Sequence, residues 1–314
     1  MPNTLNSLLP IFLMILIGWG LRASGTIKSE SWDGFEKVTY LVLFPAMIAT
    51  TMAQADLSKA PILEIGSALV LAILTVSALL ITIRPWLERR FALSGPSFTS
   101  VFQGSTRWNS FVALAIATEL YGKAGATLCA IAIAAMIPLV NVLAISVLTR
   151  HASAQPLRAK TFMLSLLRNP FILASLIGIG LNPFSQMIPA PVVNAATLLG
   201  QASLAAGLLA VGAGLQLKSA FSSDARSRFG GLILPVMLKL GVMPLLAVSF
   251  ARFFGVSGVE LSIVVVCTAV PTASASYILA RQFGGDSPLM AQILTAQTLL
   301  AMVSIPVWIY AITV

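Results

Sequence analysis

Charged side chains are scarce in this sequence. They make up 9% of its 314 residues, whereas 58% of the residues are hydrophobic. A soluble domain carries about a quarter charged residues to cover its surface. A protein whose surface faces lipid needs far fewer, and the mean hydropathy of +0.94 agrees with that environment. The composition therefore excludes an ordinary soluble domain and predicts an all-α polytopic membrane protein.

Cysteine and histidine are also rare, which excludes several kinds of chemistry. Cys129 and Cys267 each lie inside a long apolar run, so we interpret them as small packing residues and not as a disulfide framework. His151 is the one histidine and lies in a basic linker. A histidine-based metal site or catalytic triad has no residues to form it. We therefore expect neither an enzyme nor a bound cofactor or metal ion.

The apolar runs are long enough for ten membrane-spanning helices. A spanning helix needs about 20 mostly apolar residues. Because residues 1–9 contain no Lys or Arg, we expect the first run to be a retained helix and not a signal peptide. The ten runs are 5–22, 36–54, 62–83, 98–119, 124–148, 165–184, 198–217, 230–252, 259–281 and 289–312.

The linkers between these runs indicate an orientation. With the N-terminus outside, the inside linkers hold fourteen of the 19 Lys and Arg residues and the outside linkers hold three. Cytoplasmic loops carry an excess of Lys and Arg. We therefore predict a multi-pass protein of the cell (inner) membrane with both termini on the outer, periplasmic side. The net charge of +9 follows from this pattern, so no nucleic-acid partner is expected.

The first and sixth runs resemble each other. Residues 10–21 and 170–181 are identical at seven of twelve positions, at an offset of 160 residues that is close to half the chain. Two five-helix halves, 1–155 and 156–314, fit this offset. Because five is odd, the second half enters the membrane from the opposite side. The sequence thus predicts two inverted five-helix repeats, an architecture common among secondary transporters.

The fourth span of each half contains a polar or proline interruption. Residues 103–110 form a polar run in span 98–119, and Pro271 lies among Thr, Ala and Ser residues in span 259–281. Proline removes a backbone donor and disfavours helix at the residue before it. Interrupted helices of inverted-repeat carriers form the substrate site, where helix N-termini favour anions. The alternative is that Pro271 only kinks its helix.

Two cations lie inside predicted spans without an acid at comparable depth. They are Arg107 and Lys239, and inserting each costs about 2.5–3.5 kcal/mol. We interpret Arg107 as a substrate-binding or gating residue whose guanidinium grips a carboxylate. Lys239 either attracts the anion or replaces a sodium ion by donating to carbonyls that a broken helix frees. The candidate substrate-binding residues are Arg107, Asn109, Ser110, Lys239, Pro271, Thr272 and Ser274.

The sequence resembles the auxin efflux carrier family over nearly its whole length. The family includes plant auxin exporters and bacterial carriers of malate and malonate, and the short linker 149–164 fits the bacterial type. The resemblance rests on Leu43-Phe44-Pro45, on Arg107-Trp108-Asn109, on residues 209–215, on Lys239 followed by Pro244, and on residues 271–284.

This resemblance implies a fold like those of sodium/proton antiporters and bile-acid transporters, in which broken helices 4 and 9 cross. It further implies a scaffold of spans 1, 2, 6 and 7, a core of spans 3–5 and 8–10, and elevator-type alternating access. It assigns a site role to Asn109 and Pro271. One departure is that the family usually has a proline shortly after this Asn, and residues 110–117 contain none. We therefore expect the break in span 4 to rest on Gly104 and the polar side chains.

The expected function is secondary active transport or uniport of small organic anions, which are mono- or dicarboxylates such as malate or malonate, or auxin-like acids. One alternative is a sodium-coupled symporter of larger amphipathic anions, and another is a non-transporting receptor or scaffold. The expected partners are the anion and the lipid bilayer. A coupling proton or sodium ion and a homodimer through the scaffold helices stay open.

Overall fold

The structure is a computed structural model that describes residues 2–55, 61–152, 169–216 and 229–313, and these residues are almost entirely helical. Six helical stretches in this part of the chain are long and apolar enough to cross a membrane, by length and composition. They are Ile62–Phe91, Gly95–His151, Pro170–Met187, Ala190–Ala213, Phe229–Phe253 and Ser287–Ile312. Leu8–Ala23 and Gly258–Ala269 are shorter apolar helices. The chain is therefore a multi-pass helical membrane protein.

Several predicted linker cations lie outside the described residues. They are Lys59, Arg158, Lys160, Arg168, Lys218, Arg226 and Arg228. The described residues group into two compact units, each of which draws on both halves of the sequence. Unit 1 comprises Met1–Ile62, Ser110–Ala134 and Leu164–Gly214, and unit 2 comprises Leu63–Asn109, Ala135–Met163 and Leu215–Val314.

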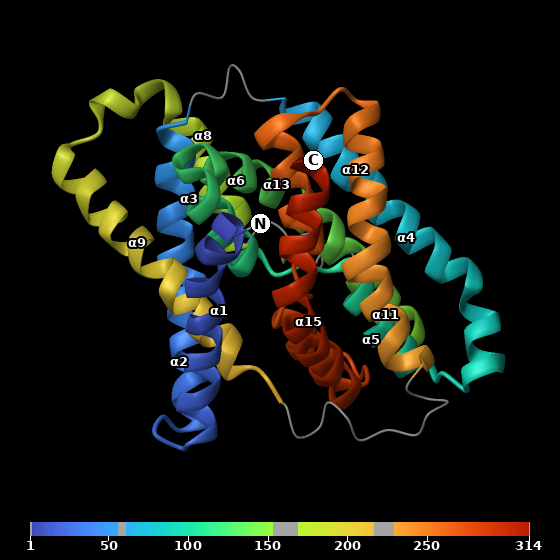
Figure 1. Cartoon of the computed structure of the whole chain (residues 1–314). Coiled ribbons are helices and arrows are strands. Elements are labelled where there is room, and N and C mark those ends of the chain that lie inside the picture. Colours follow the sequence, from blue (N-terminus) through green and yellow to red (C-terminus); the bar gives the residue numbers. More distant parts are fainter. Residues whose placement is uncertain (1, 56–60, 153–168, 217–228, 314) are drawn as a thin grey trace. The chain divides into compact units, whose positions relative to one another are not determined.

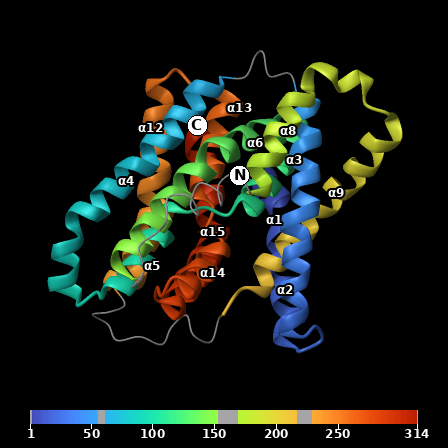
Figure 2. The same cartoon turned by 180° about the vertical axis from the view of Figure 1, so that it is seen from behind.

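Unit 1 is built on four long helical segments. Helix α1 (Pro2–Ala23) packs against α9 (Ala190–Ala213), and α3 (Phe44–Ala53) packs against α8 (Pro170–Leu181) and α9 (Figures 1 and 2). Helix α2 (Ser29–Val38) and the π-helical segment η1 (Thr39–Leu43) lead into α3, and the 3-10 segment η2 (Asn182–Met187) follows α8. The first part of α6 (Ser110–His151) completes the unit.

Helices α1 and α8 each carry a Gly-x-Gly pair whose first glycine touches a neighbouring helix. A Cβ on Gly18 would overlap the carbonyl of Leu209 in α9, and a Cβ on Gly178 would overlap the carbonyl of Ala49 in α3. A shift of 160 residues turns Gly18 into Gly178 and Ala49 into Leu209. The two contacts therefore exchange under the offset found in the sequence, and both use small residues that let membrane helices approach closely.

A second pair of contacts obeys the same shift. Arg22 donates to the carbonyl of Ala213 at the end of α9, and Asn182 donates to the carbonyl of Ala53 at the end of α3 over 3.1 Å. The last carbonyls of a helix have no intrahelical partner. Each donor therefore stabilises the C-terminus of a helix, and the donors as well as the acceptors are 160 residues apart.

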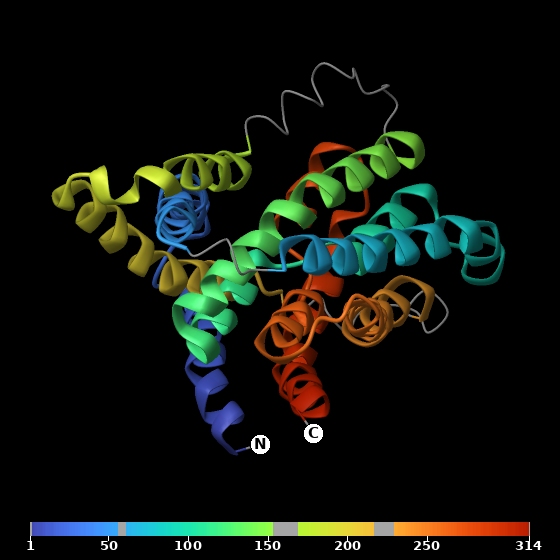
Figure 3. The same cartoon turned by 90° about the horizontal axis from the view of Figure 1, so that it is seen from above.

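Unit 2 contains the remaining helices. Within it, α12 packs against α13, α15 packs against α13 and α5, and α11 packs against α5. Seen from above in Figure 3, the orange helices α12 and α13 lie side by side. Besides the second part of α6, its elements are α4 (Ile62–Phe91), α5 (Gly95–Thr106), η3 (Phe229–Ile233), α11 (Leu234–Met237), η4 (Leu238–Val242), α12 (Met243–Phe253), α13 (Gly258–Ala269), α14 (Ala275–Gln282) and α15 (Ser287–Thr313).

Each of the π-helical segments η1, η3 and η4 ends two residues before a proline. The prolines are Pro45, Pro235 and Pro244. Because proline has no N–H, the carbonyl four residues earlier loses its α-helical partner, and the turn widens. For Pro244 this carbonyl belongs to Leu240, and the indole Nε1–H of Trp308 donates to it over 2.7 Å. A side chain of α15 thus replaces the missing backbone donor.

Two helix boundaries differ from the prediction. The expected linker between the fourth and fifth spans is a turn at Gly122, whose φ of 56° interrupts α6. Glycine adopts this left-handed backbone without strain, so a very short turn suffices. His151 was predicted in a linker, but it is the last residue of α6. The helix therefore extends to residue 151 where hydropathy alone ends it near residue 148.

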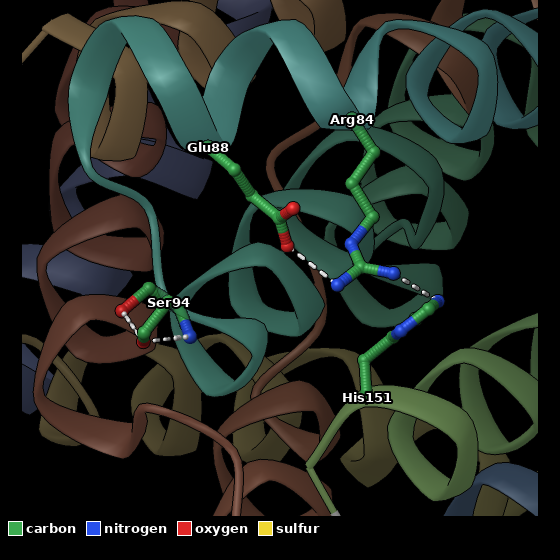
Figure 4. A network of polar contacts seen from close by, with 5 residues as sticks. Arg84, Glu88, Ser94 and His151 are labelled. Carbon is green, nitrogen blue, oxygen red and sulfur yellow. Dashed lines mark hydrogen bonds and ion pairs between the residues drawn. The ribbon is translucent and has the colours of Figure 1, made fainter.

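His151 joins a polar network at the ends of α4 and α6 within unit 2 (Figure 4). Arg84 donates to Glu88 over 2.5 Å, and its Nη1 lies 3.4 Å from Nε2 of His151. The Arg84 guanidinium also lies 5.5 Å from the ring centroid of Phe98. Ser94, drawn in the same view, accepts from the backbone N–H of Ser97 and begins α5. Partly exposed ion pairs of this kind contribute little stability, so the network mainly fixes side-chain positions.

Candidate functional site

Both predicted helix interruptions are present, and both lie in unit 2. Helix α5 ends at Thr106, Arg107 turns extended with ψ of 162°, and α6 begins at Ser110. Helix α13 ends at Ala269, Val270 turns extended with ψ of 154°, and α14 begins at Ala275. The half-helices α5 and α13 are each 12 residues long and each start with a glycine.

A backbone hydrogen bond joins the two interruptions directly. The N–H of Asn109 donates to the carbonyl of Pro271 over 2.8 Å. Extended backbone at membrane depth needs partners inside the protein. Each interruption supplies one to the other, so the sequence-predicted residues Asn109 and Pro271 are brought together.

Gln297 of α15 holds this junction from a third helix. Its amide nitrogen donates to the carbonyls of Gly104 (2.8 Å) and Pro235 (3.0 Å), and its amide oxygen accepts from the N–H of Thr272 (2.9 Å). Gly104 is four residues before Trp108, whose extended backbone no longer closes the helical turn. Gln297 is fully buried, so it satisfies backbone groups that water cannot reach.

Thr272 makes the remaining link between the interruptions. Its hydroxyl donates to the carbonyl of Gln103 over 3.2 Å and lies 3.2 Å from the hydroxyl of Ser276. Ser110 and Ser274, the other predicted site residues with hydroxyls, are half-buried at the starts of α6 and α14. The structure therefore gives Thr272 a bracing position and leaves Ser110 and Ser274 at helix N-termini.

The expected role of Gly104 in breaking the helix was wrong. The helix continues through Gly104 to Thr106. A Cβ on Gly104 would lie 2.7 Å from Cγ2 of Ile293, so this glycine allows α15 to approach. Without a proline after Asn109, the interruption instead begins at Arg107 and depends on the bonds from Asn109 and Gln297.

Arg107 lies at the end of α5. Its side chain is 7% exposed, and its Nη1 donates to the amide oxygen of Asn141 in α6 over 2.9 Å. A cation is favourable near a helix C-terminus because the carbonyls there carry partial negative charge. Arg107 is thus positioned by its own helix end and by Asn141.

Lys239 is fully buried in η4. Its Nζ has no hydrogen-bond partner among the described residues. The hypothesis that it replaces a sodium ion by donating to freed carbonyls is therefore not what the structure shows. Its electrostatic neighbour is Cys267, in the last turn of α13.

The amide of Gln103 is a further buried group in the last turn of α5. Its oxygen and its nitrogen both lack a partner in the described part of the chain, and the side chain is 0% exposed. An amide can donate two hydrogen bonds and accept two. Unpaired buried groups of this kind call for an explanation, and an unseen ligand or water is one.

Sequence reasoning missed Gln297 and Asn141. Both are neutral amides inside apolar runs, at 289–312 and 124–148, and this polarity was the available signal. The described residues contain no group of three or more His, Cys, Asp or Glu side chains that could hold a metal ion. The chemistry of the junction is therefore that of backbone groups, amides, hydroxyls and two cations.

Comparisons with known proteins agree on transport. Residues 154–309 match the family model described as "Membrane transport protein". An uncharacterized transporter of Methanothermobacter thermautotrophicus is 24% identical over 307 residues, which cover 96% of each chain. The ileal sodium/bile acid cotransporter of Oryctolagus cuniculus is 30% identical over 110 residues, which cover 35% of this chain and 31% of that protein.

The family match includes η4, the second interruption and α15, so it covers half of the junction. The archaeal relative matches along nearly the whole chain and therefore includes the first interruption as well. The chain accordingly belongs to the membrane transport protein family, which is the auxin efflux carrier family that its motifs resemble.

Proposed function

We propose that this protein is a secondary transporter of small organic anions, such as malate, malonate or auxin-like monocarboxylates. The observation that carries the proposal is the junction at Asn109 and Pro271. Two helix interruptions meet there, beside the buried guanidinium of Arg107. Broken helices of this kind form substrate sites in inverted-repeat carriers. A planar guanidinium suits a carboxylate.

The proposed architecture is two inverted five-helix repeats. The paired contacts of Gly18 with Leu209 and of Gly178 with Ala49 support it, because a shift of 160 residues exchanges them. The half-helices α5 and α13 support it too, since both have 12 residues and begin 163 residues apart. In this proposal unit 1 is a scaffold and unit 2 is the moving core of an elevator mechanism.

The proposed roles of the site residues follow their positions. Arg107 binds the carboxylate, and Asn109 presents the anion to the start of α6. Ser110 and Ser274 lie at helix N-termini, where an anion is favourable. Pro271 and Thr272 hold the junction open through their bonds to Asn109, Gln103 and Gln297.

Uptake of radiolabelled malonate into proteoliposomes tests the proposal. We expect Arg107→Ala to lower the apparent affinity by about 10–100-fold, the loss expected for a charge-assisted bond of about 1.5–3 kcal/mol. Arg252→Ala is the matched control, because Arg252 is an exposed cation at the end of α12. Full uptake with unchanged affinity by Arg107→Ala would remove Arg107 from the site. Malonate binding without flux would favour a receptor instead.

A second candidate is sodium-coupled symport of larger amphipathic anions. The 110-residue similarity to the ileal sodium/bile acid cotransporter favours it. Uptake of a bile salt and of malonate, each measured in sodium and in potassium buffers, separates the two. The carboxylate carrier predicts malonate uptake that is equal in both buffers. Bile-salt uptake that requires sodium would favour the symporter.

A further inference from the structure

Lys239 is a charged group of unit 2 that binding at Arg107 leaves without a task. Its side chain is 0% exposed, and its Nζ has no hydrogen-bond partner in the described part of the chain. It lies in η4, the π-helical segment that Pro244 produces. Such π-helical turns occur frequently at functional sites.

The helices around Lys239 do not place a carboxylate beside it. Those that contact η4 include α5, α12, α13 and α15. Of the titratable side chains on them, Cys267 interacts electrostatically with Lys239. Glu260 lies seven residues before Cys267, roughly 10 Å along α13 at about 1.5 Å per residue. The titratable side chains of these four helices are Arg252, Glu260, Cys267 and Tyr310.

An ammonium in this position is stable only with an anion nearby. An isolated buried charge costs far more than a neutral group, so a buried amine without an anion gives up its proton. An anion that enters the same low-dielectric region favours the protonated form, since Coulomb attraction there is strong. The half-helices α5 and α13, which end at the junction, both contact η4.

We propose that Lys239 is the proton-binding group that couples anion transport to proton transport. The neutral amine takes one proton from the side where the anion enters and becomes an ammonium. Its charge offsets one negative charge of the anion while the core moves. On the other side the anion and the proton both leave, and the amine is regenerated. This inference rests on the proposed function, because it requires a transported anion.

Proton movement measured together with malonate uptake tests the inference. Proteoliposomes that enclose a pH-sensitive dye are given radiolabelled malonate at several external pH values. For the unsubstituted protein, we expect one proton to enter with each malonate. We expect the uptake rate to fall about tenfold for each pH unit above the value at which Lys239 loses its proton, because each unit lowers the protonated fraction tenfold.

Two variants make the result specific. Lys239→Arg keeps a permanent cation, so malonate uptake should continue with no proton signal and with no fall at high pH. Lys239→Met has a similar shape without a charge and should take up malonate at least about tenfold more slowly at every pH. Size-exclusion profiles of the purified variants verify folding.

The outcomes distinguish this inference from the proposed function. Malonate uptake without proton entry overturns the coupling role and leaves the anion carrier intact. The same holds if Lys239→Arg and the unsubstituted protein show the same pH dependence and the same proton signal. Absence of malonate and monocarboxylate uptake by the unsubstituted protein would overturn the anion carrier and the coupling together.

Discussion

Gln297 connects more of the junction than any residue chosen from the sequence. Its amide pairs with the carbonyls of Gly104 and Pro235 and with the N–H of Thr272. We expect Gln297→Leu to leave three buried backbone groups unpaired, at about 1–3 kcal/mol for each. The midpoint of thermal unfolding in detergent should fall clearly, and malonate uptake should fall with it.

Gln292→Leu is the matched control for this prediction. Gln292 is half-buried in the same helix, and the same side-chain change there should leave the unfolding midpoint near that of the unsubstituted protein. Equal midpoints for the two variants would show that the bonds of Gln297 do not stabilise the junction.

Residue types that carry charge or restrict the backbone were predictable from the sequence. Pro271 indicated an interruption through its missing N–H, and Arg107 indicated one through its insertion cost. Gln297 was not predicted, because a neutral amide in an apolar run fits a buried core as well as a site. Its importance depends on which carbonyls α5 and α11 leave unpaired, and that information exists only in three dimensions.

Close packing within unit 1 leads to a prediction for whole helices. We expect Gly18→Ala to force α1 away from α9 and Gly178→Ala to force α8 away from α3, because each Cβ would overlap a backbone carbonyl. Overpacking typically costs about 1–3 kcal/mol. Both variants should therefore unfold at lower temperature than the unsubstituted protein.

The second glycines of the same pairs provide the controls. A Cβ on Gly20 or Gly180 has no heavy atom within 4 Å. Alanine in a helix is favoured over glycine by about 0.5–1 kcal/mol, so Gly20→Ala and Gly180→Ala should be neutral or stabilising. A loss of stability in the controls equal to that in Gly18→Ala and Gly178→Ala would contradict the packing argument.

The sequence predicts individual helices better than their pairing. The match between residues 10–21 and 170–181 revealed the offset, but hydropathy does not tell which helix touches which glycine. Once the pairs are known, the shift of 160 residues accounts for both of them. The π-helical segments were likewise unpredicted, although each precedes a proline that is visible in the sequence.

At the scale of the whole molecule, hydropathy and linker charge together predict how the chain crosses the bilayer. The division into two compact units could not be predicted from either signal, because each unit combines segments from both halves of the sequence. Residues 110–134 belong to unit 1, although they follow directly on α5 of unit 2. Only the contacts that folding creates assign them there.

Labelling of single cysteines in intact cells tests the predicted orientation. In a background with Cys129→Ala and Cys267→Ala, a membrane-impermeant maleimide is added from outside. We expect it to label Gln186→Cys and Ser257→Cys, which lie in predicted outer linkers. Ala23→Cys and Gln282→Cys should react only after permeabilisation. All four native side chains are exposed, so differences in labelling report the side of the membrane.

The pattern separates an error in orientation from an error in the number of spans. Two predicted spans lie between Gln186 and Ser257, and eight lie between Ala23 and Gln282, so each pair must share a side if the number is right. Labelling of Ala23→Cys and Gln282→Cys from outside, with protection of the other two, would reverse the orientation and keep the ten spans. Labelling of one member of a pair without the other would mean an odd number of crossings between them, and the two five-helix halves would then be wrong. The excess of Lys and Arg in the predicted inside linkers favours the first pattern, with both termini outside.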